Sequence, residues 1–190
     1  MQNPTSGEKK LILINIEFSR IFMAWSIPSL KNQRINIGLE ILASILSVGR
    51  NSRLVKVLKE EKNLVQSIYA DVNGGELGGL LIIEACCDEM NLKNVEEEIN
   101  KSIQEVMSFK NLNQNELRKA INIVKSNYIF NLETSTQLTS FFGNEFLWGR
   151  KNSIEDFNNH LEFWNNLNNF KEIINLLSRN KFTFIASKSQ

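Results

Sequence analysis

The residue types that catalyse hydrolysis are scarce in this chain. His160 is the only histidine, and the two cysteines, Cys86 and Cys87, are adjacent. A protein zinc site takes three or four His, Cys or carboxylate ligands, and its usual motifs contain two histidines or two cysteine pairs. A catalytic triad would also have to use His160, and no G-x-S-x-G turn accompanies it. We therefore expect no catalytic and no metal-binding residue in this chain, and a surface or partly packed helix position for His160.

Other groups that could do chemistry each have a structural explanation. The cysteines end an apolar strand pattern, where free cysteine behaves as a small hydrophobic residue, and a reactive thiol is the alternative. The glycine-rich segment 73–79 joins two predicted strands and leads into no helix, so it predicts a flexible turn and not a phosphate cradle. Aromatic residues at helical spacing are expected in the core and not around a ligand: Phe141, Phe142, Phe146 and Trp148.

The charge balance argues against several classes of partner. The 22 basic and 21 acidic residues leave a net charge of +1, which attracts neither nucleic acid nor an anionic membrane. The first ten residues are polar, and no apolar run approaches the roughly 20 residues that span a bilayer. We expect no nucleic-acid and no membrane partner. The adjacent cysteines do not suit a structural disulfide and favour a reducing compartment such as the cytoplasm.

The hydrophobic pattern predicts one α+β domain. We expect residues 1–10 to be a flexible tail or an expression remnant, and residues 11–190 to form the domain. Capping pairs mark three helix starts: Asn113 with Glu116, Ser153 with Asp156, and Asn169 with Glu172. Strand patterns occur at 11–27, 67–72, 80–87 and 181–187, and helical patterns at 33–48, 52–62, 94–107, 113–132 and 135–148, followed by two short helices.

The alternation in the strands predicts a sheet with two unlike faces. One face of the strand 80–87 is apolar, as a face covered by helices should be. We expect Glu84 on the other face, with Arg20 and Phe22 of the first strand on its equivalent. Such a face is too apolar for free solvent and too charged for a core, which suits a wall that faces a partner domain or a substrate cavity. Arg20 and Glu84 are thus candidate substrate-binding residues.

Two short stretches then suggest a family. The sequence G-R-N-S-R-L at 49–54, followed by L-K-E-E-K-N-L at 58–64, resembles the second domain of each half of the M16 peptidases, the family of insulinase, pitrilysin and mitochondrial processing peptidase. Ser52, Arg53 and Leu54 match its S-R-L motif, and Glu116 lies in N-E-L-R-K-A, which resembles its E-E-L-x-x-A-K helix start. The resemblance implies a metallohydrolase-like domain with a mostly antiparallel sheet of about six strands, backed by helices.

The same resemblance implies how such a chain would work. M16 peptidases form a clamshell whose H-x-x-E-H zinc motif lies in an amino-terminal domain and is absent here. This chain would hold no cofactor itself, and zinc would belong to the partner half, in the same full-length chain or in a separate subunit. The remaining partners implied are a polypeptide substrate and, as a further candidate, a second copy of this chain.

The resemblance also assigns two positions to substrate binding. Lys59 and Gln66 align with an arginine and a tyrosine that hold the substrate backbone in the family. Lysine keeps the cation but loses the planar fork, and glutamine keeps an amide but loses the phenol. Tyr69 does not obviously replace the lost tyrosine, because strand alternation would point it to the opposite side from position 66.

Three functional hypotheses follow. The first is the carboxy-terminal substrate-cavity domain of an M16-type zinc metallopeptidase, completing a clamshell around peptides and inactive by itself. The second is a non-catalytic homologue that acts as an interaction or scaffold subunit. The third is a small-molecule or regulatory module, suggested only by the mixed face of the sheet.

Overall fold

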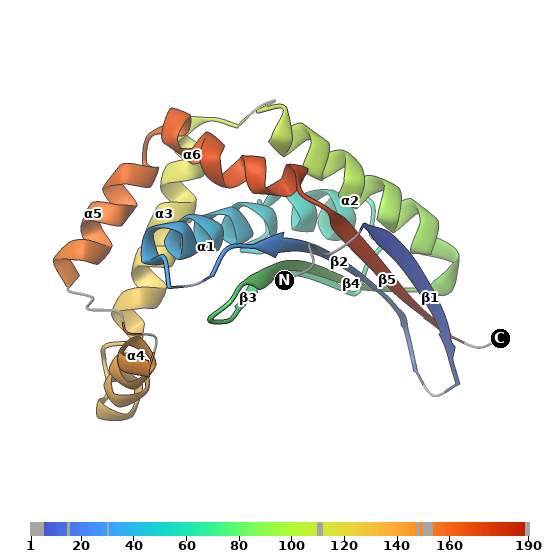
Figure 1. The fold of residues 1–190 in the computed structure, drawn as a ribbon. Helices are drawn as coiled ribbons and strands as arrows, with labels where there is room; N and C mark the ends of the chain where they lie inside the picture. The colour runs from blue at the N-terminus through green and yellow to red at the C-terminus, as the bar shows by residue number, and fades with distance from the viewer. Residues whose placement is uncertain are drawn as a thin grey trace.

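The computed structural model describes residues 6–14, 16–29, 31–109, 112–147, 149 and 154–188. Within them the chain forms one mixed sheet with helices packed over one face (Figure 1). The α+β class and the helix-backed sheet predicted from the sequence are confirmed, with five strands among the described residues where about six were expected. No described helix is both long and apolar enough to cross a membrane.

The sheet has the strand order β1-β5-β2-β4-β3, and its pairings are antiparallel except for β1 with β5. Its strands are β1 (Gly7–Leu13), β2 (Ser19–Ile27), β3 (Ser67–Gly74), β4 (Gly79–Cys87) and β5 (Lys181–Lys188). Residues 7–10, predicted as a tail, instead begin β1, because β5 supplies a parallel partner: Gly7 pairs with Phe182. A flexible glycine turn closes the β3–β4 hairpin as expected, with the Gly75 N–H donating to the Gly78 carbonyl.

The helices lie between and after the strands. They are α1 (Gln33–Ser47), the π-helical turn η1 (Val55–Glu61), the short 3-10 turns η2 (Glu89–Asn91) and η3 (Asn175–Ser178), α2 (Leu92–Met107), α3 (Gln114–Phe130), α4 (Ser135–Leu147), α5 (Ile154–Trp164) and α6 (Leu167–Ile174). The Asn113 cap is confirmed, since its side chain accepts from the Glu116 N–H. The Asn169 cap is wrong: α6 begins earlier, and Asn166 caps it through the Asn168 N–H. Ser153 lies outside the described residues.

The core lies between the sheet and α1. Alternate side chains of β2 and β4 point into it, with Ile21, Met23, Leu81 and Ile83 fully buried. The helix α1 is buried on nearly all sides because it contacts β3 beneath it and α3, α5 and α6 around it (Figure 1). Helix α2 covers the neighbouring part of the same face, against β2 and β4. Among the described residues, no helix therefore packs on the opposite face of the sheet.

Helix α4 corrects a further expectation. Its aromatic residues were predicted to be core, but Phe142 and Phe146 are exposed, whereas Phe141 is half-buried against Tyr128. Trp148 lies outside the described residues. Periodicity identified a helix with an apolar stripe, but it could not show that α4 projects from the body of the domain (Figure 1). The stripe is consequently an exposed apolar surface.

Close packing around α1 gives a test of the core. A Cβ on Gly38 would lie 2.6 Å from Ile173 and 2.9 Å from Trp164. We expect Gly38→Ala to lower the free energy of unfolding by about 1–3 kcal/mol through overpacking. Gly143 in α4 has open space at the same position, so Gly143→Ala should raise stability by up to about 1 kcal/mol through helix propensity. Urea unfolding followed by circular dichroism measures both, and equal effects of the two substitutions would contradict this packing.

Candidate functional site: the open face of the sheet

Three side chains on the open face of the sheet form a connected polar group, which we call the Arg20–Glu84–Tyr69 group. Glu84 is on β4, between β2 and β3; Arg20 Nη1 donates to its Oε1 at 2.5 Å, and the Tyr69 hydroxyl donates to its Oε2. The strand register explains the meeting, because Glu84 is paired with Tyr69 on β3, while Arg20 on β2 is paired with the adjacent same-face residue Cys86. Arg20 and Glu84, both predicted from the sequence, therefore lie on one face and in contact.

The electrostatics of the group follow from its unequal burial. The Arg20 side chain is 50% exposed and that of Glu84 only 9%. The hydrogen bond and the charge of Glu84 raise the pKa of Arg20, and the hydrogen bond to Glu84, with burial and that charge, raises the pKa of Tyr69. Arg20 thus stays cationic and Tyr69 stays a neutral phenol near neutral pH. Arg20 has further N–H groups that can donate to a carbonyl or carboxylate oxygen, whereas the single hydrogen of the Tyr69 hydroxyl is already donated to Glu84.

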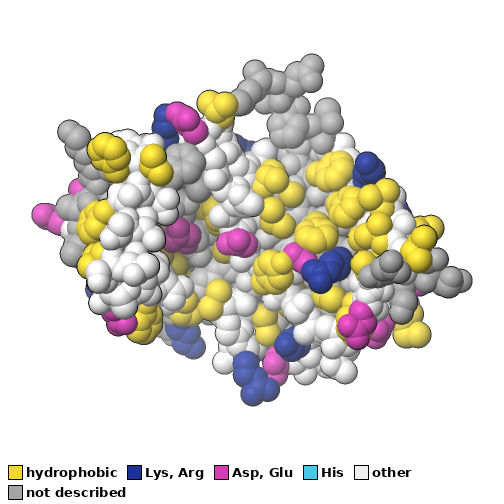
Figure 2. Space-filling view, turned by 90° about the horizontal axis from the view of Figure 1, so that it is seen from below, with side chains coloured by type: hydrophobic (Ala, Val, Ile, Leu, Met, Phe, Trp, Pro, Cys, Tyr) yellow, Lys and Arg dark blue, Asp and Glu magenta, His cyan; other side chains and the backbone are white. Residues whose placement is uncertain are grey.

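Apolar side chains surround the polar group. Phe22 and Phe184 are paired across β2 and β5, with ring centroids 6.0 Å apart, and Leu80 and Phe182 are each 41% exposed. Figure 2 shows this face with basic and acidic side chains close together among hydrophobic ones. The mixed character that the alternation predicted is therefore present, and it extends over four strands. Such a surface is typical of interaction sites and ligand-binding walls.

Tyr69 is the member that sequence reasoning missed. Strand alternation puts Tyr69 on the opposite side from position 66, and the register of the hairpin, with Asn73 paired with Leu80, places it directly beside Glu84. The sequence signal that could have found it is the pairing of two same-face polar residues across a hairpin, once the turn length is known.

The two positions singled out by the family resemblance lie elsewhere. Lys59 is exposed on η1, and Gln66 is exposed just before β3, where its backbone N–H donates to the Cys86 carbonyl at 2.8 Å. Among the described residues, no hydrogen bond joins Lys59 or Gln66 to Arg20, Glu84 or each other. Gln66 does share an end of the sheet with Arg20, since Cys86 pairs with Arg20. Asn63 occupies the left-handed region, with φ of 48°, at the turn that ends η1.

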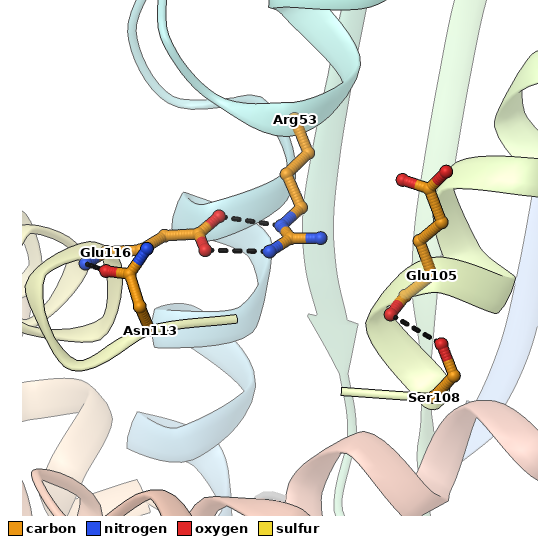
Figure 3. Close-up of polar contacts among 5 residues, drawn as sticks. All are labelled: Arg53, Glu105, Ser108, Asn113 and Glu116. Atoms are coloured by element: carbon orange, nitrogen blue, oxygen red, sulfur yellow. Dashed lines mark hydrogen bonds and ion pairs between the residues drawn. The ribbon is translucent and has the colours of Figure 1, made fainter. Parts of the chain in front are cut away.

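The motif residues around position 53 hold the domain together. Arg53 binds Glu116 through two parallel bonds, Nε to Oε1 at 2.6 Å and Nη2 to Oε2 at 2.8 Å (Figure 3). Glu116 is also held by the Asn113 cap at the start of α3, so the pair ties η1 to α3. Leu54 is fully buried. Ser52 does not cap η1 with its side chain, because its hydroxyl donates to the Gly49 carbonyl at 2.7 Å.

The nucleophile and histidine candidates are not part of the open-face group's chemistry. Cys86 and Cys87 are buried and form no disulfide. Burial raises the pKa of Cys86, and burial raises that of Cys87 to about 11, which disfavours the thiolate form of both at neutral pH. His160 is half-buried on α5, and burial lowers its pKa. In the described part of the chain, no three His, Cys, Asp or Glu side chains are grouped as a metal site.

The fold and the open-face group define a class of protein: an α+β domain with helices on one face of its sheet and a mixed polar and apolar wall on the other. Comparison with known families gives the class a name. The sequence profile of the Peptidase M16 inactive domain matches residues 2–124. The chain belongs to this family. No curated protein sequence matches the chain.

Solved structures share the fold at low sequence identity. A protease from Helicobacter pylori is 14% identical with a TM-score of 0.82, over 95% of this chain and 43% of its own. A putative M16-like peptidase from Alicyclobacillus acidocaldarius is 14% identical with a TM-score of 0.82, and the match covers 97% of this chain and 44% of the peptidase. A chain of Complex III2 from Candida albicans is 15% identical with a TM-score of 0.80, and the match covers 96% of this chain and 46% of that one. This chain thus spans less than half the length of each.

The partly buried pair of Arg53 and Glu116 predicts a change in stability. Arg53→Lys keeps the charge but removes the fork that binds both Glu116 oxygens, so we expect a loss of about 1–2 kcal/mol in the free energy of unfolding. Arg50→Lys is the matched control, because Arg50 is 84% exposed and contacts only one oxygen of Glu60; it should leave stability unchanged. Denaturant unfolding measures the free energy of unfolding of both variants, and equal losses of stability would contradict a special role for Arg53.

The open-face group predicts a shift in one titration. With Tyr128→Phe as background, Tyr69 is the remaining tyrosine. We expect Glu84→Gln in that background to lower the pKa of Tyr69 toward about 10, because the charged acceptor that favours the neutral phenol is gone. The absorbance of the tyrosinate ion, followed from neutral to alkaline pH, measures the pKa of Tyr69. As a control, Glu76→Gln removes an equal charge from the distant hairpin turn and should leave the pKa of Tyr69 unchanged. If Glu84→Gln also leaves that pKa unchanged, the hydrogen bond between Tyr69 and Glu84 is excluded.

Proposed function

We propose that this chain is the carboxy-terminal substrate-cavity domain of an M16-type zinc metallopeptidase. The observation that carries the proposal is the open face of the sheet, where the Arg20–Glu84–Tyr69 group lies in an apolar surround. A wall of this kind suits an extended peptide, whose backbone needs hydrogen-bond partners and whose side chains need apolar contacts. Family membership and the partial length relative to the solved structures support the same proposal.

In this proposal the residues of the chain position the peptide. A zinc ion held by the other half would supply the activated water. Arg20, kept cationic and half-exposed by its bond to Glu84, donates to a carbonyl or to the terminal carboxylate of the peptide. Glu84 fixes the directions of Arg20 and Tyr69. Lys59 and Gln66, both exposed, would contact the peptide farther along the cavity.

A second function has its own support. A scaffold subunit, with no share in proteolysis, is favoured by the fold likeness to Complex III2 and by the loss of the arginine and tyrosine at positions 59 and 66. The exposed apolar residues of α4, including Phe146 at 84% exposure, suit a permanent partner in either case. The two functions differ in whether joining the halves produces catalysis.

Reconstitution distinguishes them. The chain is mixed with a zinc-bearing H-x-x-E-H half, encoded upstream in the same reading frame or in a neighbouring gene, and cleavage of an unfolded fluorogenic peptide is followed. We expect no cleavage by either half alone and zinc-dependent cleavage by the mixture. Association without cleavage would favour the scaffold function, and absence of association would contradict both.

The open-face residues are tested in the active mixture. We expect Arg20→Ala to raise KM several-fold with a smaller effect on kcat, because a peptide contact is lost while the zinc half is unchanged. Arg50→Ala removes an exposed arginine away from the face and serves as the control. Equal kinetic constants for the Arg20 variant and the parent would exclude Arg20 from substrate binding.

A further inference from the structure

The two edges of the sheet differ in how their outer backbone groups are used. The edge strands are β3 and β1, at opposite ends of the sheet (Figure 1). On β3, the Ala70 N–H donates to Ser47 Oγ of α1 at 2.7 Å, and the Val72 N–H donates to Asp71 Oδ1 at 2.8 Å. Side chains thus occupy part of this edge, which hinders the addition of a further strand.

The edge formed by β1 has no such cover among the described residues. Residues 7–13 pair with β5, and beyond that pairing no backbone hydrogen bond joins them to another described segment. Every residue of the strand is exposed. In an edge strand, every second residue directs its N–H and C=O away from the sheet, so β1 presents a row of donors and acceptors that a further strand can bind.

Four consecutive apolar side chains follow this edge, and we call residues 11–14 the apolar block. Their exposed fractions are 40% for Leu11, 72% for Ile12, 39% for Leu13 and 81% for Ile14. Leu11 lies on the open face of the sheet, because its partner Ala186 is itself paired with Arg20. Strand alternation puts Ile12 on the other side, where its high exposure shows that α2 does not cover it. Both sides of the edge therefore offer apolar contacts to a partner strand.

The sequence of β1 fits an antiparallel copy of itself. Its charged residues, Glu8, Lys9 and Lys10, all precede the apolar block, and Lys10 binds Glu8 at 3.0 Å. With Ile12 opposite Ile12 of a second copy, residue 11 lies opposite residue 13 on the same face, and residue 10 lies opposite residue 14. Apolar side chains then meet apolar ones, and no two like charges face each other. Such self-complementarity is what a two-fold interface requires.

We propose that β1 is a dimerisation edge, at which two copies of this chain pair their β1 strands antiparallel and join two five-stranded sheets into one. The backbone hydrogen bonds between the strands supply the affinity, and the apolar block fixes the register. Because β5 separates β1 from β2, the Arg20–Glu84–Tyr69 group stays uncovered, on the same side of the joined sheet in both copies. The dimer does not depend on the zinc-peptidase proposal.

Sedimentation equilibrium of the 190-residue chain tests the dimer. We expect a reversible dimer with a dissociation constant in roughly the micromolar range, because the contact of one strand pair is small. Ile12→Lys puts like charges opposite each other and should raise the constant at least about tenfold. Phe146→Lys adds the same charge to the exposed apolar surface of α4 and should leave the constant unchanged. Both positions are exposed, so both variants should fold, which circular dichroism checks.

A cysteine tests the register of the pairing. In the proposed dimer, the two Ile12→Cys residues face each other at the separation of about 4.5–5.5 Å between Cα atoms that opposite strand residues have, which a disulfide spans. Mild oxidation should therefore give a covalent dimer. Leu77→Cys places a thiol in the exposed β3–β4 turn as the control and should give none, and the native cysteines are buried.

Four outcomes would overturn the proposal. The first is a chain that stays monomeric at about 100 μM. The second is a dimer that Phe146→Lys disrupts and Ile12→Lys does not, which would move the interface to α4. The third is equal crosslinking of the two cysteine variants. The fourth is a monomer whose Ile12→Lys variant no longer associates with the zinc-bearing half, which would assign the β1 edge to that half. Failure of the halves to cleave peptides would leave the dimer unaffected.

Discussion

The packing of α1 onto one face of the sheet is the interaction on which the rest of the structure depends. The helix is buried on the sheet side by β3 and on its other sides by α3, α5 and α6, and it can approach α6 so closely because position 38 is glycine. Once α1 and α2 occupy this face, the helices have no further face to cover. In the described part of the chain, the opposite side of the sheet carries no helix.

The open face is stable without a helix because its one buried charge is satisfied locally. Glu84 is 7% exposed although no helix packs above it. Arg20 and Tyr69 cover it from the strands on either side and fill both of its oxygens. Removing one partner would leave a buried carboxylate short of hydrogen bonds, which costs more than the pair itself contributes. The polar group is therefore both a structural unit of the sheet and the most specific surface that this face can offer.

The family motif acts in the architecture of the domain. Arg53 and Glu116 join two elements that are distant in sequence, and Leu54 is in the core. The positions that the resemblance assigned to substrate, Lys59 and Gln66, have changed residue type and are exposed. The match to the Peptidase M16 inactive domain, over residues 2–124, includes both Arg53 and Glu116.

The sequence by itself determined the α+β class, the mixed face of the sheet and features set within a few residues, such as the Asn113 cap. These depend on periodicity and on contacts three or four residues apart, which local sequence contains. Tertiary structure alone decided that residues 7–10 pair with β5, that Tyr69 meets Glu84, and that α4 projects with its aromatic stripe exposed. Those outcomes depend on strand register and on packing between distant segments, because a shift of one residue reverses the face of every side chain in a strand.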